Sequence, residues 1–222
     1  MKFHRTKGIL LLAALALSST ASANDDFWLG VKAGTLGFGV EGSWRPIKWL
    51  DVRAGANFYD YDATETQAGI TYDATVALDT YYVTGNFRFP LSPFRLTAGA
   101  FSNGNELRMV SQPSPSYDLG NSVGYLPAEV GSLQSVSSFD GVSPYVGAGF
   151  DFDIMNRLGL SLDFGVLLQG EPQVSLTSDG ALALIQDPGF LADLEAERSE
   201  LQNELKDLKA YPVVSIGFNF NF

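Results

Sequence analysis

Charged residues of this chain alternate with apolar residues in several stretches, which is the spacing of one face of a β-strand. In the clearest stretch, residues 49–61, Asp51 and Arg53 share one face, and Val52 and Phe58 share the other. Repeating this pattern along the chain places opposite charges on inward faces, where they can pair with one another or contact a small charged solute. The charged residues predicted to face inward are Lys32, Glu41, Arg45, Asp51, Arg53, Arg88, Arg95, Asp151, Asp153 and Asp163.

Residues that would support catalysis are scarce. His4, the only histidine, lies within an N-terminal segment that we expect to be removed, and the chain has no cysteine. The mature chain therefore has no imidazole for a Ser/His or Cys/His pair, and a carboxylate pair is the remaining acid-base candidate. We expect no enzymatic activity and no cofactor.

Two short motifs are better explained by strand turns than by ligand binding. Residues 34–39, GTLGFG, lack the Lys-Ser/Thr of a phosphate loop. Asp151, Asp153 and Asn156 have the spacing of the start of a calcium loop, but the glycine and final glutamate of that loop are missing. We therefore expect no metal site.

The C-terminal residues give the clearest indication of the environment in which the strands lie. Residues 213–222 read VVSIGFNFNF, with Phe218, Phe220 and Phe222 on an apolar face and small or polar residues on the other. A soluble sandwich strand would alternate in the same way, but it has little reason to end at its most apolar residue. A terminal Phe with apolar residues at every second position resembles the signal that the outer-membrane assembly machinery of Gram-negative bacteria recognises. We therefore interpret this segment as a lipid-facing barrel strand that carries the assembly signal.

The N-terminal residues predict export. Residues 1–23 combine three basic residues, an apolar run at 9–17 and the small-residue site Ala-Ser-Ala, so we expect a signal peptide that is removed before Asn24. The remaining stretches are too short to form a membrane helix. A membrane protein made from residues 24–222 must therefore be a β-barrel in the outer membrane.

Alternation along the chain predicts an all-β fold, an eight-stranded antiparallel transmembrane β-barrel. The expected strands lie at about 27–34, 38–44, 49–61, 72–89, 94–106, 144–153, 158–174 and 213–222. A Pro-, Gly- and Ser-rich stretch at about 107–141 is predicted to be a long polar loop. Short turns follow the second, fourth and sixth strands, which predicts that both termini face the periplasm.

An eight-stranded barrel is only just wide enough for its own side chains to fill it. The inward charges predict either a plug of paired groups or a narrow polar path for small solutes. In either case, Arg53 and Arg88 are expected near Asp51 and Asp163.

A segment at about 188–209 is predicted to be an amphipathic helix within the last loop. Asp187-Pro188 suits a helix start, and Leu194, Leu201 and Leu208 recur at heptad-like spacing. The leucine stripe indicates either a partner-binding or lid helix, or a loop helix packed on the barrel rim or on the long loop. Its outer face is acidic.

The overall charge limits the partners. Without residues 1–23 the chain has 11 Lys and Arg against 25 Asp and Glu, a net charge of −14. We therefore expect no nucleic-acid partner. The expected partners are outer-membrane lipid and the assembly machinery, with the barrel as a monomer and any extracellular partner left open.

Several motifs together resemble a known group of barrels. They are GTLGFGVEGSW, WLDVRAGANFYDYD, SPYVGAGFDF, GLSLDFGVLLQGEPQVSLT and YPVVSIGFNFNF. Spanning about residues 29–222, they look like the small outer-membrane barrels related to the carbapenem-associated, ornithine-uptake channel of Acinetobacter. The resemblance implies passive passage of small solutes such as amino acids. The alternative is a non-conducting structural or surface-interaction barrel.

Overall fold

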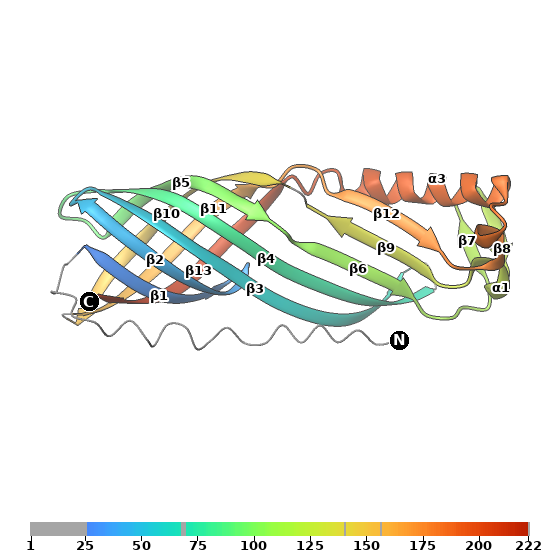
Figure 1. Cartoon of the computed structure of the whole chain (residues 1–222), viewed down its shortest axis with the longest axis horizontal. Coiled ribbons are helices and arrows are strands. Elements are labelled where there is room, and N and C mark those ends of the chain that lie inside the picture. Colours follow the sequence, from blue (N-terminus) through green and yellow to red (C-terminus); the bar gives the residue numbers. More distant parts are fainter. Residues whose placement is uncertain (1–25, 68–69, 140, 156, 222) are drawn as a thin grey trace.

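The computed structural model describes residues 26–67, 70–139, 141–155 and 157–221, so the expected signal peptide and Phe222 lie outside the described residues. Eight strands form a closed antiparallel barrel, because β4 pairs with β5 as well as with β3. The barrel strands are β1 Phe27–Gly34, β2 Gly37–Ile47, β3 Leu50–Gln67, β4 Ile70–Arg88, β5 Phe94–Asn103, β10 Val142–Met155, β11 Leu158–Leu168 and β13 Ala210–Asn221. The predicted eight-stranded fold is confirmed (Figure 1).

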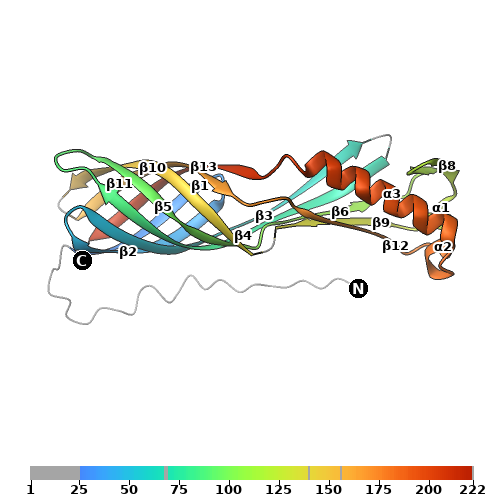
Figure 2. The same ribbon diagram turned by 90° about the horizontal axis from the view of Figure 1, so that it is seen from above.

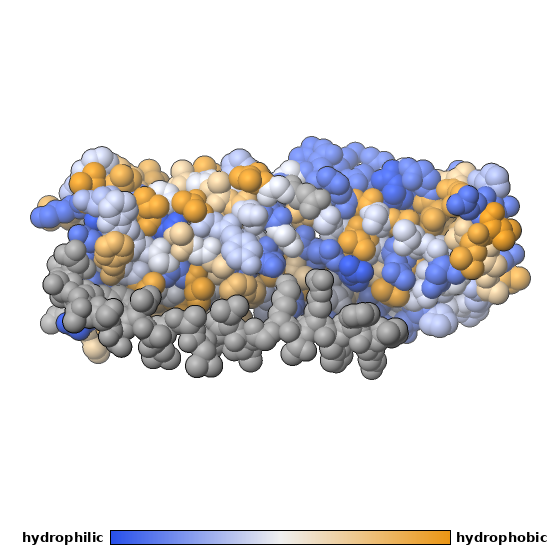
Figure 3. Space-filling model, viewed as in Figure 1, coloured by the Kyte–Doolittle hydropathy of each residue, from blue (hydrophilic) through white to orange (hydrophobic). Residues whose placement is uncertain are grey.

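The alternation of side chains explains the two faces of the barrel wall. On β13, Phe218 is 56% exposed while its neighbour Asn219 is 9% exposed. Pairing continues this division onto the adjacent strand, where Val31 lies opposite Phe218 and is also exposed. Apolar residues therefore cover much of the outer wall, as lipid contact requires (Figure 3). Polar residues face the lumen.

The two ends of the barrel differ. One end, here called the turn end, carries the connections β2–β3, β4–β5 and β10–β11 and both ends of the described chain. From the other end, here called the loop end, β3 and β4 continue as a paired hairpin well beyond the end of β2. The molecule is consequently elongated, with a folded head beyond the barrel (Figure 2).

The head is an open sheet with a helix packed against it. Strands β6 Glu106–Ser111, β9 Leu133–Ser138 and β12 Gln173–Ser178 extend the β3–β4 hairpin in the order β12-β9-β6-β4-β3. The far end of the head is closed by β7 Tyr117–Leu119, β8 Ser122–Tyr125, α1 Pro127–Val130, α2 Ala181–Leu184 and the start of α3 Pro188–Leu205.

The head has its own apolar core. Phe190 and Leu194 of α3 pack with residues of the long connection between β5 and β10, and Phe190 is only 1% exposed. Asp187 caps α3, since its carboxylate accepts a hydrogen bond from the Phe190 N–H at 2.9 Å. The first half of this helix is therefore packed on the long connection between β5 and β10.

Several predicted strand bounds differ from the structure by a few residues, and the strand expected at 49–61 continues to Gln67. Three further differences concern the loops and the helix. Residues 107–141, expected to be an irregular polar loop, contain β6, β7, β8, α1 and β9. The predicted strand 158–174 is two strands, because β11 ends at Leu168 and β12 belongs to the head sheet. The helix ends at Leu205 rather than 209, and Leu208 is 51% exposed, so the last leucine of the predicted stripe does not pack in a core.

None of the helices in the described ranges is long and apolar enough to cross a membrane.

Candidate functional site

A network of buried charges fills the turn-end half of the lumen. Its centre is Asp151 on β10, which contacts guanidinium groups from three other strands. The Asp151 Oδ2 atom lies 3.0 Å from Arg53 Nη2, 2.6 Å from Arg88 Nη2 and 3.0 Å from Arg95 Nε. One carboxylate thus ties β3, β4 and β5 to β10 across the barrel.

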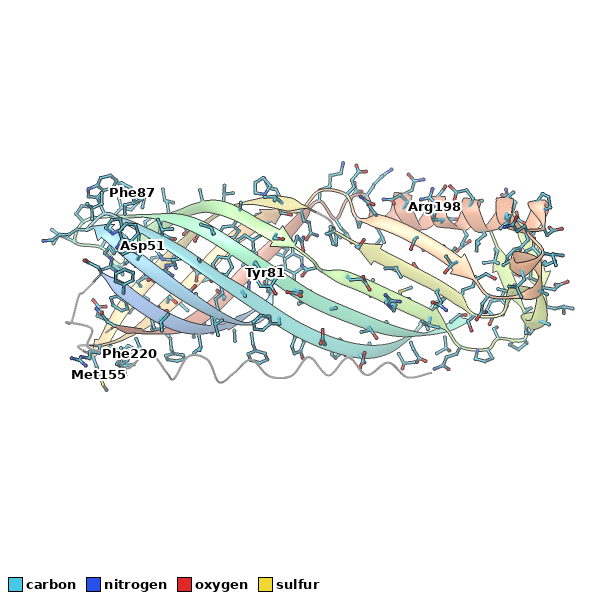
Figure 4. All side chains as sticks on the ribbon, in the orientation of Figure 1. Asp51, Tyr81, Phe87, Met155, Arg198 and Phe220 are labelled. Atoms are coloured by element: carbon cyan, nitrogen blue, oxygen red, sulfur yellow. The ribbon has the colours of Figure 1, made fainter. Side chains whose placement is uncertain are left out.

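Two further acids complete this network. Asp51, which Figure 4 places in the turn-end part of the barrel, pairs with Arg88 and lies 3.4 Å from Arg53 Nε. Asp163 on β11 pairs with Arg95. Asp51 and Arg95 are each 1% exposed, so these pairs are shielded from water, and each buried charge is compensated by its partner.

Asp163 faces the lumen network, as predicted, and its ion-pair partner is Arg95. The sequence placed this acid near Arg53 and Arg88, and the acid that pairs with both of these residues across the lumen is Asp151. Alternation fixes which face a side chain occupies. It does not fix which strands meet across the lumen, because this depends on the stagger of the closed barrel.

Neutral side chains hold the network in place. Arg95 Nη1 donates to the Asn86 Oδ1 atom at 3.0 Å and to the Thr97 hydroxyl at 2.7 Å. The Asn86 amide in turn donates to Asp51 at 2.6 Å. These bonds restrict Arg95 to one orientation, which supports its pairing with both Asp151 and Asp163.

A second branch runs toward the loop end. The Tyr82 hydroxyl donates to Glu41 Oε2 at 2.7 Å, and Lys32 Nζ lies 3.8 Å from the same oxygen and 4.0 Å from the centre of the Tyr82 ring. Arg53 Nη1 lies 3.5 Å from Glu41 Oε1 and so joins this branch to the network. Eight of the ten predicted residues are thereby brought into one connected set.

On the loop-end side of this branch, a layer of apolar side chains crosses the lumen. Phe101 stacks on Tyr82 with ring centres 4.8 Å apart, and the Tyr145 ring lies 5.1 Å from Phe101. Leu167 and Leu36 pack in the same cluster, and Leu167 is 0% exposed. The lumen is thus closed first by apolar side chains and then by paired charges.

This apolar layer was not predicted from the sequence. Its residues lie on inward faces, where alternation leads one to expect polar side chains. A signal does exist in the neighbouring glycines, because a Cβ atom at Gly147 or Gly165 would lie 2.6 or 2.3 Å from the Tyr145 hydroxyl oxygen. These two positions are small because a large inward side chain occupies the space beside them.

The two remaining predicted residues, Arg45 and Asp153, stand apart from the network. Both line a cavity of about 550 Å³ at the turn end, here called the vestibule, together with Arg53, Arg88 and Asp151. The Arg45 guanidinium lies over Trp28 at 5.3 Å. Both residues therefore line the lumen, as predicted, although neither forms an ion pair with a residue in the described part of the chain.

The remaining expected residues lie as follows. Phe218 and Phe220 face outward on β13, as predicted, and Phe222 is not among the described residues. Tyr59 lies at the loop-end rim beside Phe38 and is 43% exposed. Across the described positions, no group of three or more His, Cys, Asp or Glu has the arrangement of a metal site.

Comparisons with known proteins support the fold. The chain is similar to CarO2 of Acinetobacter baumannii, with a TM-score of 0.59 and 21% identity over 89% of this chain and 98% of that one. CarO of the same organism gives a TM-score of 0.58 and 20% identity over 91% and 100% of the two chains. Neisserial surface protein A gives a TM-score of 0.32 and 13% identity over 89% and 94%.

No protein-family model matches the chain, and the comparison with curated proteins finds no match. The resemblance predicted from the motifs is therefore confirmed at the level of the fold, which is that of a small outer-membrane barrel.

Proposed function

We propose that this chain is a non-conducting outer-membrane barrel that holds a folded head at the cell surface for interaction with other molecules. The filled lumen carries this proposal. A water-filled pore would leave its lining groups exposed, but Arg95 is 1%, Phe101 3% and Tyr145 4% exposed. The buried layer and the charge network lie one above the other, so a solute would have to displace both.

The architecture of the head supports the second part of the proposal. It has a core of its own, and its sheet is continuous with two barrel strands. Short turns of such barrels face the periplasm and long connections face outward, so the loop end would present the head outside the cell. A chain whose function was confined to the lumen would not need a separate core in its loops.

Conductance measurements test the proposal. Refolded protein in planar bilayers should give no conductance steps beyond those of a bilayer without protein. Liposomes that contain the protein and are loaded with lysine, ornithine or glutamate should release the solute no faster than loaded liposomes without protein. Migration of unboiled and boiled protein on a gel confirms that the sample is folded. A triple variant, Tyr82→Ala with Phe101→Ala and Tyr145→Ala, removes the apolar layer and shows whether the charge network alone keeps the lumen closed. Steps or solute release in the wild type would refute the proposal.

A second candidate is passive passage of small solutes such as amino acids, which the vestibule favours. Arg45 and Asp153 present unpaired opposite charges at the turn-end mouth, where a solute could bind before entering the lumen. Under this candidate, Arg45→Gln should change the ratio of glutamate to lysine release. Equal ratios for the variant and the wild type would remove the support that the vestibule gives.

A further inference from the structure

The far end of the head carries an exposed apolar surface. Its members, here called the tip patch, are Val123 on β8, Leu126 before α1, Leu184 at the end of α2 and Ile185 after it. They are 82%, 58%, 77% and 71% exposed, respectively. Figure 3 shows apolar residues gathered at this end, beyond a helix-covered region that is mainly hydrophilic.

These side chains are not needed for packing. Their neighbours Tyr125 and Leu182 turn inward onto the head core, whereas the members of the tip patch turn away from it. Exposed apolar residues on the barrel wall are covered by lipid, but the tip lies at the opposite end of the molecule from the turn end, beyond the barrel (Figure 1). A grouped apolar surface outside the membrane is typical of an interaction site.

The charge around the tip patch is of one sign. Residues 109–139 and 173–197, which build the far part of the head, contain no Lys or Arg. The acids in the described part of these segments are Asp118, Glu129, Asp179, Asp187, Asp193, Glu195 and Glu197.

Most of these acids are fixed by the fold. Asp118 accepts a hydrogen bond from the Gly124 N–H at 2.9 Å, and Asp179 accepts one from the Ser132 N–H at 2.6 Å. These two bonds come from neutral backbone donors and add no positive charge, whereas Glu195 pairs with Arg198.

The apolar side chains of the tip patch and the acidic residues around it together indicate which kind of molecule could bind there. A second copy of the chain would bring another acidic tip, and like charges oppose such an association. A basic partner meets the opposite field and gains both attraction and apolar burial. We propose that the tip patch binds a basic amphipathic segment of another protein, in which Lys or Arg flank apolar side chains. This inference rests on the proposed role of the head as an interaction surface.

A labelled form of the full chain provides the test. Since the chain has no cysteine, Ala181→Cys, exposed at the start of α2, gives a single site for a fluorescent dye. The protein is placed in neutral-lipid nanodiscs and titrated with a synthetic Lys/Leu amphipathic helix. A Glu/Leu helix with the same apolar face is the matched peptide.

We expect saturable binding of the Lys/Leu helix, weakened by added salt, and no saturation with the Glu/Leu helix. Replacing Val123, Leu184 and Ile185 by Ser should weaken binding by at least about tenfold, which corresponds to about 1.4 kcal/mol. Leu91→Ser, at a fully exposed apolar residue of the turn end, is the control and should bind like the wild type.

Three outcomes would overturn the inference: equal binding of both peptides, equal binding by the triple variant, or self-association of the chain through its tip. Conductance of the same sample separates this test from that of the proposed function. A closed barrel that does not bind the peptide refutes only the inference, and a conducting barrel that does bind it refutes only the closed lumen.

Discussion

Removing the charge of Arg95 tests whether the lumen is dry. The guanidinium lies 3.0 Å from Asp151, pairs with Asp163, and donates hydrogen bonds to Asn86 and Thr97. Arg95→Met retains much of the side-chain length but leaves Asp163 without a cation. Removing one partner of a buried ion pair costs about 3–5 kcal/mol, because the remaining charge is neither solvated nor paired. We expect this loss in the free energy of unfolding.

Two further variants complete the measurement. Arg45→Met removes a lumen cation that has no ion pair among the described residues, so its cost should be below about 1 kcal/mol. Adding Asp163→Asn to Arg95→Met should recover part of the loss, since the unpaired charge is then removed as well. Urea unfolding in lipid vesicles, followed by tryptophan fluorescence, gives the free energies, and an unchanged slope shows that the variants unfold alike. Similar small costs for Arg95→Met and Arg45→Met would mean that water solvates the network, and the closed lumen would then lose its support.

Three other variants test the outer wall and the head. Phe218→Lys places a charge on the lipid face and should cost about 2–4 kcal/mol if the residue lies near the bilayer centre, measured by the same urea unfolding. Phe190→Ala should destabilise the head by about 3–5 kcal/mol, because this side chain is buried in the head core, and proteolysis should then cleave the head while the gel shift of the barrel persists. The Tyr125 hydroxyl donates to Asp193 at 2.6 Å and holds the pKa of that carboxyl below its ordinary value of 3.8. Asp193 therefore stabilises the head above that pH and loses this contribution as the pH falls below it, so Tyr125→Phe should reduce the acid sensitivity of head cleavage.

The barrel could be predicted from the sequence because its walls separate lipid from a polar lumen. The strand expected at residues 38–44 is found as Gly37–Ile47, and the one at 27–34 is found with the same bounds. The head could not be predicted in this way. In β9, Ser135 and Ser137 lie on the buried face, and Val136 lies on the other, so alternation gives no apolar face to recognise.

The sequence predicted which charged side chains face the lumen, but it did not predict which of them pair with one another. Alternation placed Arg53 and Asp151 inward, but the two residues are 98 positions apart and meet only because the barrel closes. The separation of Arg45 and Asp153 from the network has the same origin. Both lie near the turn end, where the lumen widens into the vestibule and fewer side chains reach across.

The β3–β4 hairpin runs from the barrel into the head, so its length fixes the distance between the barrel and the tip. Beyond its last pairing with β2 at Phe58, β3 continues to Gln67, which at about 3.3 Å per residue is about 30 Å of strand. The distance of the tip from the barrel therefore depends on how many residues the hairpin has beyond β2. Removing two residues from each strand would bring the tip closer to the barrel and keep every side chain on its face of the sheet. Removing one residue from each strand would instead move the side chains beyond the deletion to the opposite face.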